Sequence, residues 1–75
     1  MAEPIHPATK QLLDFFNSEH LPADLASVVE PFRNLAWDLV ASGLGGAEVT
    51  AGLRKLLESK DCFVRAAVLA RGEEG

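Results

Sequence analysis

The sequence is poor in cysteine and histidine, and this scarcity excludes several kinds of site. Cys62 is the single cysteine among 75 residues, so no disulfide can form within the chain. The two histidines, His6 and His20, do not stand at metal-ligand spacing from each other or from Cys62, which argues against a structural zinc ion. We therefore expect no bound metal and a reducing compartment.

Long apolar runs and an excess of positive charge are also missing. No run approaches the ~20 residues that a membrane-spanning helix needs, and the opening residues MAEPIHPATK lack the basic and apolar regions of a signal peptide. The formal charge of −4 argues against binding to duplex nucleic acid or to an anionic membrane, since both depend on a basic surface. A small anionic ligand is compatible with this charge, and the expected location is the cytoplasm.

The alternating pattern typical of strands is absent, and apolar residues recur at helical spacing instead. Residues 1–6 are expected to form a flexible arm, and Pro7 suits the first position of a helix of about three turns. A second helical region covers residues 22–42. Pro31 falls inside it, which predicts a kink or two abutting segments.

The third and longest helical stretch covers residues 48–71. Glycines at positions 43, 45 and 46 predict a short turn before it, so it is expected to return antiparallel to the second stretch as a helical hairpin braced by the first helix. Residues 72–75 are expected to be a frayed tail. The predicted fold class is all-α with a single domain over residues 1–75, and the small core favours assembly into a compact homo-oligomer.

The sequence offers no catalytic constellation. His6 and His20 stand near opposite ends of the first predicted helix, and Cys62 has no adjacent histidine to activate it. The stretch GLGG follows a predicted helix and not a strand, which indicates a turn and not a nucleotide-binding loop. We expect no enzymatic activity and no cofactor.

Lys60 is the residue that the helical pattern explains least. It falls between Leu56 and Phe63 on the apolar stripe, where a charged head has to reach water, bind an anion or contact another subunit. Arg65 follows Asp61 by one helical turn, so these two side chains can form an ordinary surface pair. On the sequence alone, the alternatives for Lys60 stay open.

Three segments of the chain follow one another in a recognisable order: LLDFFNSEHLPADL, EPFRNLAWDLV and EVTAGLRKLLESKDCFVRAA. They run from residue 12 to residue 67, within a match that covers roughly residues 6–68. The succession resembles the small helical-hairpin domain of phage anti-CBASS proteins, the sponges that sequester cyclic oligonucleotide immune signals. The residues that match the family pattern are Phe16, His20, Leu21, Pro22, Pro31, Phe32, Leu35, Ala36, Glu48, Leu56, Leu57, Glu58, Lys60, Asp61, Val64, Arg65 and Ala66.

The resemblance implies a homo-oligomer, a hexamer in the best-known members, that captures cyclic di- or trinucleotides such as cyclic GMP-AMP and cyclic tri-AMP without cleaving them. It would act in the host bacterial cytoplasm and block CBASS-type signalling. Phosphates need guanidinium or ammonium donors. The resemblance points to Arg65 and Lys60 for this role, with Arg33 and His20 as further candidates. Phe16 is the candidate for stacking on a base.

Two positions depart from the family pattern. Ser18 stands where the family commonly has an aromatic residue that stacks on a base, and Glu30 stands where a basic residue often occurs. Loss of a stacking platform removes ~1–3 kcal/mol per base, and a carboxylate near a phosphate repels it. These changes affect the dinucleotide site more than a trinucleotide site built from the last helix. The alternative function is a helical protein–protein interaction or oligomerisation module without a nucleotide ligand.

Overall fold

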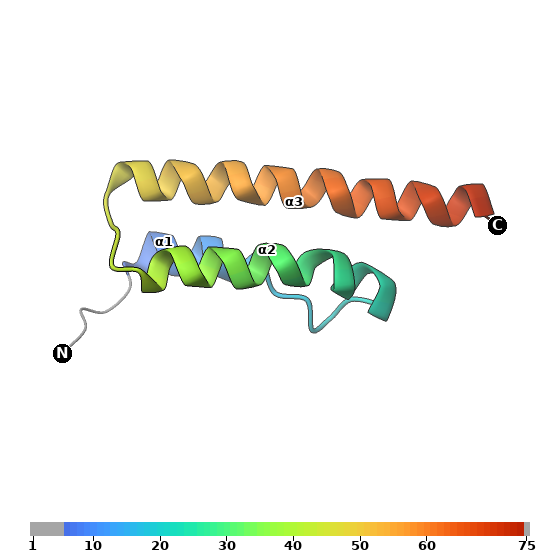
Figure 1. The fold of residues 1–75 in the computed structure, drawn as a ribbon, viewed down its shortest axis with the longest axis horizontal. Coiled ribbons are helices and arrows are strands. Elements are labelled where there is room, and N and C mark those ends of the chain that lie inside the picture. Colours follow the sequence, from blue (N-terminus) through green and yellow to red (C-terminus); the bar gives the residue numbers. More distant parts are fainter. Residues whose placement is uncertain (1–5, 75) are drawn as a thin grey trace.

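The computed structural model describes residues 6–74, and three helices make up most of this part of the chain. Helix α1 covers Pro7–Asp14, α2 covers Ala23–Ala41 and α3 covers Ala47–Glu74 (Figure 1). No strand occurs among the described residues, so the predicted all-α class is confirmed. The predicted arm lies outside the described residues, except for its last residue, His6.

Helix α1 begins at the predicted proline. Pro7 is its first residue, and Nδ1 of His6 accepts a hydrogen bond of 3.1 Å from the amide of Ala8. Because a proline has no amide hydrogen, this bond satisfies the first free backbone donor of the helix. The helix ends at Asp14, and the chain turns at the next two residues.

Helix α2 starts directly after Pro22 and continues as one helix through Pro31. Its first turns are inclined to the rest of the helix (Figure 1), which is the effect of a proline ring on the turn before it. Of the two alternatives predicted for this region, the chain has a bent helix and not two separate segments.

Residues 42–46 connect α2 to α3, and two of their glycines adopt backbone angles that L side chains rarely take. Gly43 has φ of 91° and Gly46 has φ of 99°. Helix α3 then continues for 28 residues, about 42 Å at ~1.5 Å per residue. It ends at Glu74, beyond the predicted end at residue 71. The predicted tail is therefore helical as far as Glu74, and residue 75 lies outside the described part.

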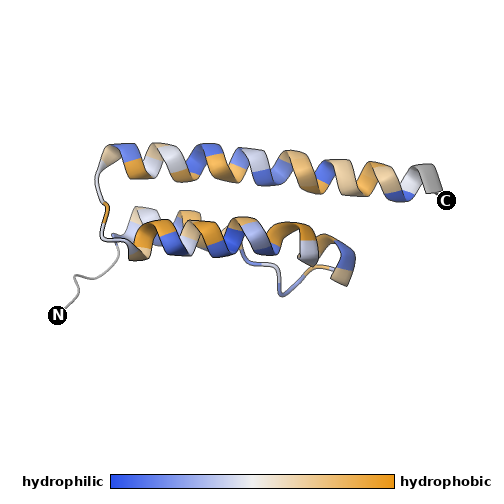
Figure 2. Ribbon diagram, in the orientation of Figure 1, coloured by the Kyte–Doolittle hydropathy of each residue, from blue (hydrophilic) through white to orange (hydrophobic). Residues whose placement is uncertain are grey.

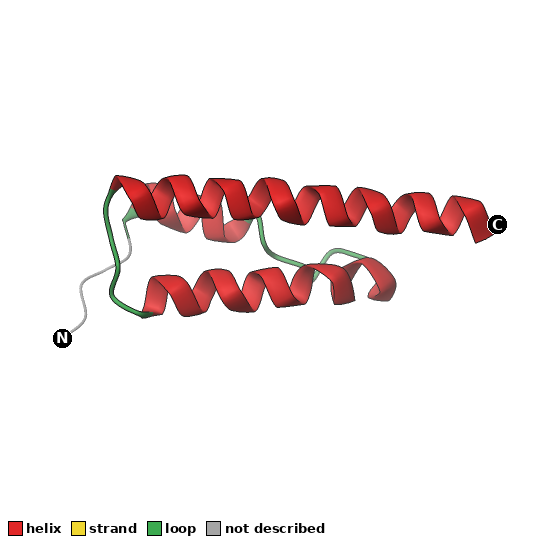
Figure 3. Ribbon diagram, turned by 45° about the horizontal axis from the view of Figure 1, so that its top comes forward, coloured by secondary structure: helices red, strands yellow, loops and turns green. Residues whose placement is uncertain are grey.

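Helices α2 and α3 lie side by side and run in opposite directions, and α1 packs against one side of the pair (Figures 1 and 3). The molecule is elongated, with principal extents of 50 × 20 × 17 Å. With eight residues, α1 is only about 12 Å long, so it covers part of that side. The core where the helices meet contains Leu12, Leu13, Phe16, Ala36 and Leu53.

Apolar residues are not confined to this core. Figure 2 shows hydrophobic and hydrophilic segments alternating along all three helices. The large apolar side chains exposed among the described residues are Phe15, Leu35, Trp37, Leu39, Leu44, Phe63, Val68 and Leu69. Single exposed apolar residues are common, whereas contiguous ones mark interaction surfaces. Within the described part of the chain, no helix is both long enough and apolar enough to cross a lipid bilayer.

Candidate functional site

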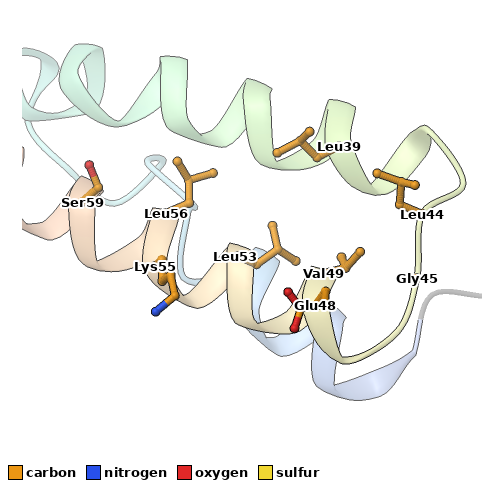
Figure 4. Close-up of a pocket in the computed structure, with 10 residues that line it drawn as sticks. Leu39, Leu44, Gly45, Glu48, Val49, Leu53, Lys55, Leu56 and Ser59 are labelled. Carbon is orange, nitrogen blue, oxygen red and sulfur yellow. The ribbon is translucent and has the colours of Figure 1, made fainter.

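A pocket of about 640 Å³ opens between the end of α2, the 42–46 turn and the first half of α3. Leu39 and Leu44 approach it from one side, and Leu53 and Leu56 approach it from α3 (Figure 4). No residue of α1 belongs to its lining, so the pocket lies where α1 leaves the helix pair uncovered. The complete lining is Leu39, Leu44, Gly45, Glu48, Val49, Gly52, Leu53, Lys55, Leu56 and Ser59.

The apolar surface continues from the pocket along both helices. Leu35 lies one turn before Leu39 on α2, and Phe63 lies two turns after Leu56 on α3. The ring of Phe63 packs at a tilt against Phe32, with the two centroids 5.7 Å apart. We call this strip the open face and define it by Leu35, Leu39, Leu44, Val49, Leu56 and Phe63. Four of these six are exposed despite being large and apolar.

Two unlike charges stand on the α3 side of the pocket. Glu48 and Lys55 both line it, and they are seven residues, or about 10 Å of helix rise, apart. Neither takes part in the ion pairs found among the described residues. Gly52 lies between them, and a Cβ placed on it would meet nothing within 4 Å. The middle of the pocket wall is therefore bare backbone that another molecule can approach closely.

Lys60 has two partners inside the chain. Its Nζ donates a hydrogen bond of 3.2 Å to the carbonyl oxygen of Phe15 and lies 2.7 Å from a carboxylate oxygen of Asp61. Phe15 caps the C-terminal end of α1, where the helix dipole favours a positive charge. Only 13% of the Lys60 side chain is exposed. This lysine therefore joins α3 to the end of α1, a structural role that the sequence pattern did not indicate.

Arg65 does not form the predicted pair with Asp61, because the Asp61 carboxylate faces Lys60. Its Nη2 donates instead to Sγ of Cys62 at 3.2 Å, and both side chains are exposed. Arg33 is exposed on α2 and belongs to no ion pair among residues 6–72. The guanidinium groups of Arg33 and Arg65 are therefore both accessible to an anion.

The remaining two candidates differ sharply in accessibility. His20 is exposed in the connection between α1 and α2. Phe16 is 0% exposed, in the core with Leu13 and Leu53. Its ring cannot stack on a base unless the core opens, so the structure removes it from the accessible candidates. Among the described residues, no hydrogen bond or ion pair joins any two of the five predicted site residues.

The sequence did not predict the bidentate contact between Asp24 and Arg71. Nε and Nη2 of Arg71 donate to the two carboxylate oxygens of Asp24, each at 2.6 Å. These hydrogen bonds, together with the positive charge of Arg71, lower the pKa of Asp24, and the same pair raises the pKa of Arg71. The two residues are 47 positions apart, so only the antiparallel placement of α2 and α3 brings them together.

The described residues contain no group of three or more histidine, cysteine, aspartate or glutamate side chains placed to hold a metal ion. Comparison of the chain with protein-family models, curated proteins and solved structures gave no significant match.

Proposed function

We propose that this chain is a phage anti-defence sponge that binds cyclic di- or trinucleotides and holds them without cleavage, which blocks CBASS-type signalling in the host cytoplasm. The observation that carries the proposal is the order and spacing of the three family-like segments in the sequence. The first of them contains the connection between α1 and α2, the second lies on α2, and the third lies on α3. The three segments thus include part of every helix.

The proposed working form is a homo-oligomer, a hexamer by resemblance, in which α2 and α3 of each subunit act as a helical hairpin. A ligand with two or three phosphates needs several cationic donors at once. In one chain the two candidate guanidinium groups lie on different helices, Arg33 on α2 and Arg65 on α3. Copies of these groups from neighbouring subunits would supply the donors together, so the ligand would bind between subunits.

Arg65 is the residue that we assign first to phosphate binding. A guanidinium can make two parallel hydrogen bonds to a phosphate, and the only side-chain bond of Arg65 in the described chain is to a thiol. Lys60 already donates to a backbone carbonyl and faces a carboxylate. Its positive charge would still attract a nearby phosphate, but its ammonium group already binds the end of α1.

Native mass spectrometry tests the proposal directly. The purified chain is measured alone and after mixing with cyclic GMP-AMP, cyclic tri-AMP and their linear counterparts. We expect an oligomer that retains a cyclic nucleotide at fixed stoichiometry, with the ligand mass unchanged after long incubation. A chain that retains none of the cyclic nucleotides contradicts the sponge function, and a shortened or linearised ligand contradicts capture without cleavage.

Calorimetric titration of two matched variants tests the site. Arg65→Ala should weaken binding by about tenfold or more, because a hydrogen bond between two charged groups contributes roughly 1.5–3 kcal/mol. Arg54→Ala is the control, since Arg54 is also exposed on α3 and belongs to no ion pair of the described residues. Equal affinities for the two variants would remove Arg65 from the site even if the wild-type chain binds ligand.

A second candidate function is a helical protein–protein interaction module. The open face favours it, because contiguous exposed apolar residues are typical of surfaces that bind another protein. Retention of nucleotide separates the two functions. An oligomer that binds none of the cyclic nucleotides in the panel would support the interaction module and contradict the sponge.

A further inference from the structure

We propose that the open face binds the open face of a second copy of the chain, with α3 of one protomer antiparallel to α3 of its partner. The inference rests on the proposed function in requiring a homo-oligomer, and it adds which surface pairs and in which orientation. The contact is two-fold, so each residue pair across it occurs twice. The α2–α3 pair of one protomer then packs against the α2–α3 pair of the other, so that four helices meet at the contact.

The surface itself gives the first reason. Helix α1 contributes no residue to the pocket lining and is too short to extend along α3. Four of the six open-face side chains are therefore left exposed: Leu35, Leu39, Leu44 and Phe63. At its centre is the 640 Å³ pocket, whose walls are mainly aliphatic. Leu44, 62% exposed at its edge, is the kind of side chain that fills a partner's pocket. In a two-fold contact, Leu44 of each protomer can enter the apolar surface of the other.

The charges give the second reason and set the orientation. Glu48 and Lys55 line the same pocket, and no ion pair of the described residues includes either of them. Along one helix they are about 10 Å apart. When two copies of α3 lie antiparallel, Glu48 of one protomer stands opposite Lys55 of the other, and the reverse pair forms at the same time. A parallel arrangement would place like charges opposite each other.

Gly52 gives the third reason, because it marks the point where the two helices can come closest. It lies between Glu48 and Lys55 in the sequence and lines the pocket with them. It has no Cβ, and nothing of its own chain lies within 4 Å of the place where a Cβ would be. A glycine within a helix is less stable than an alanine, so its presence here fits a position where another helix comes close.

The first test uses sedimentation velocity over a range of protein concentrations. We expect the wild-type chain to form dimers or a larger even-numbered assembly. Gly52→Leu should shift the chain to monomers, because the added side chain occupies the contact. The variant should still fold, since the new leucine side chain points into open space in the monomer.

Gly72→Leu is the matched control. Gly72 is also within α3, and a Cβ there would meet nothing within 4 Å, but Gly72 lies far from the pocket. It should assemble like the wild type.

The second test exchanges the charges. Glu48→Lys alone and Lys55→Glu alone should each weaken self-association by roughly tenfold, since each creates like-charge pairs across the two-fold contact. The double variant should recover wild-type affinity, because both pairs re-form with reversed signs. Glu58→Lys, an exposed acid on α3 outside the pocket lining, is the control for the change of net charge and should leave assembly unchanged.

Three results would overturn the inference. A wild-type chain that stays monomeric at high concentration leaves the open face to a different partner. An oligomer that tolerates Gly52→Leu uses another surface. Lack of rescue in the double variant contradicts the antiparallel orientation. Because these assays contain no nucleotide, they separate the two proposals: assembly through the open face without ligand retention would contradict the sponge and leave this contact intact.

Discussion

The guanidinium of Arg71 holds the carboxylate of Asp24 through two hydrogen bonds of 2.6 Å, which ties the last turns of α3 to the first turn of α2. A paired, planar contact of this kind fixes both direction and distance. It is the only ion pair among residues 6–72 that joins two helices. The far end of the helix pair is therefore held by a polar contact, whereas the other end is joined by the 42–46 turn.

This contact predicts an acid-sensitive contribution to stability. The folded-state pKa of Asp24 lies below its unfolded value, so the contribution is complete above the unfolded pKa of about 3.9 and is lost as the pH falls through the lower folded value. Asp24→Asn should lower the melting temperature at neutral pH, and the difference from wild type should shrink at about pH 2. Thermal unfolding followed by circular dichroism measures both.

Asp38→Asn is the control for that experiment, because Asp38 is exposed on α2 and belongs to no ion pair of the described residues. It should melt close to the wild type at neutral pH. A difference for Asp24→Asn that is equally large in acid would contradict the assigned role of the charged pair.

Lys60 predicts a stability effect that is independent of any ligand. Lys60→Met keeps the long apolar stem but removes the donor to the Phe15 carbonyl, so it should cost about 1–2 kcal/mol of unfolding free energy. Urea denaturation measures the loss. Arg54→Met, the same exchange of charge for a thioether at an exposed position of α3, should cost less than about 0.5 kcal/mol. Similar losses of unfolding free energy in both variants would mean that the contact of Lys60 with α1 does not stabilise the fold.

Two adjacent phenylalanines predict opposite outcomes. Phe16 is 0% exposed, and Phe15 is 63% exposed. Phe16→Ala leaves a cavity in the core and should cost about 3–5 kcal/mol, close to the whole stability expected for so small a domain. Phe15→Ala should cost little, since its ring already meets water. Because Phe16→Ala is expected to unfold the chain, Phe16→Leu is measured as well and should cost less. Equal effects at positions 15 and 16 would contradict the described end of α1.

The turn predicts a similar contrast between neighbouring glycines. Gly46 has φ of 99°, so Gly46→Ala should destabilise the chain by roughly 1–2 kcal/mol. Gly45 does not have a positive φ, and a Cβ there would meet nothing within 4 Å. Gly45→Ala should therefore be neutral or slightly stabilising. The urea concentrations at which the two variants are half unfolded measure this difference. A larger loss of stability for Gly45→Ala than for Gly46→Ala would rule out this turn geometry.

Much of the fold could be predicted because its signals are local. Apolar residues at helical spacing indicated three helices, and Pro7 and the glycines after residue 42 marked boundaries that the structure reproduces within a residue or two. The end of α3 was placed too early, because Gly72 was expected to stop the helix and instead lies within it. One glycine costs a helix only about 1 kcal/mol, and Arg71 directly before it is held by its contact with Asp24.

The long-range contacts of the candidate site could not be predicted in this way. Phe15 and Phe16 are identical in type, and which one enters the core depends on the residue where α1 stops. The partner of Lys60 is a backbone carbonyl 45 residues away, which no pattern of side chains reveals. For Asp61, Arg65 offered a favourable partner one turn away, yet Lys60 beside it took that place. Tertiary packing determines which side chain is buried and which partner each charged group has.

The short 42–46 turn also has a kinetic consequence. Residues on either side of it are close in sequence, so the pairing of α2 with α3 can begin there at little cost in loop entropy and extend along the helices. The Asp24–Arg71 contact at the far end would then form late. We expect its loss to accelerate unfolding and leave the rate of folding nearly unchanged, so that this contact lengthens the lifetime of the native chain.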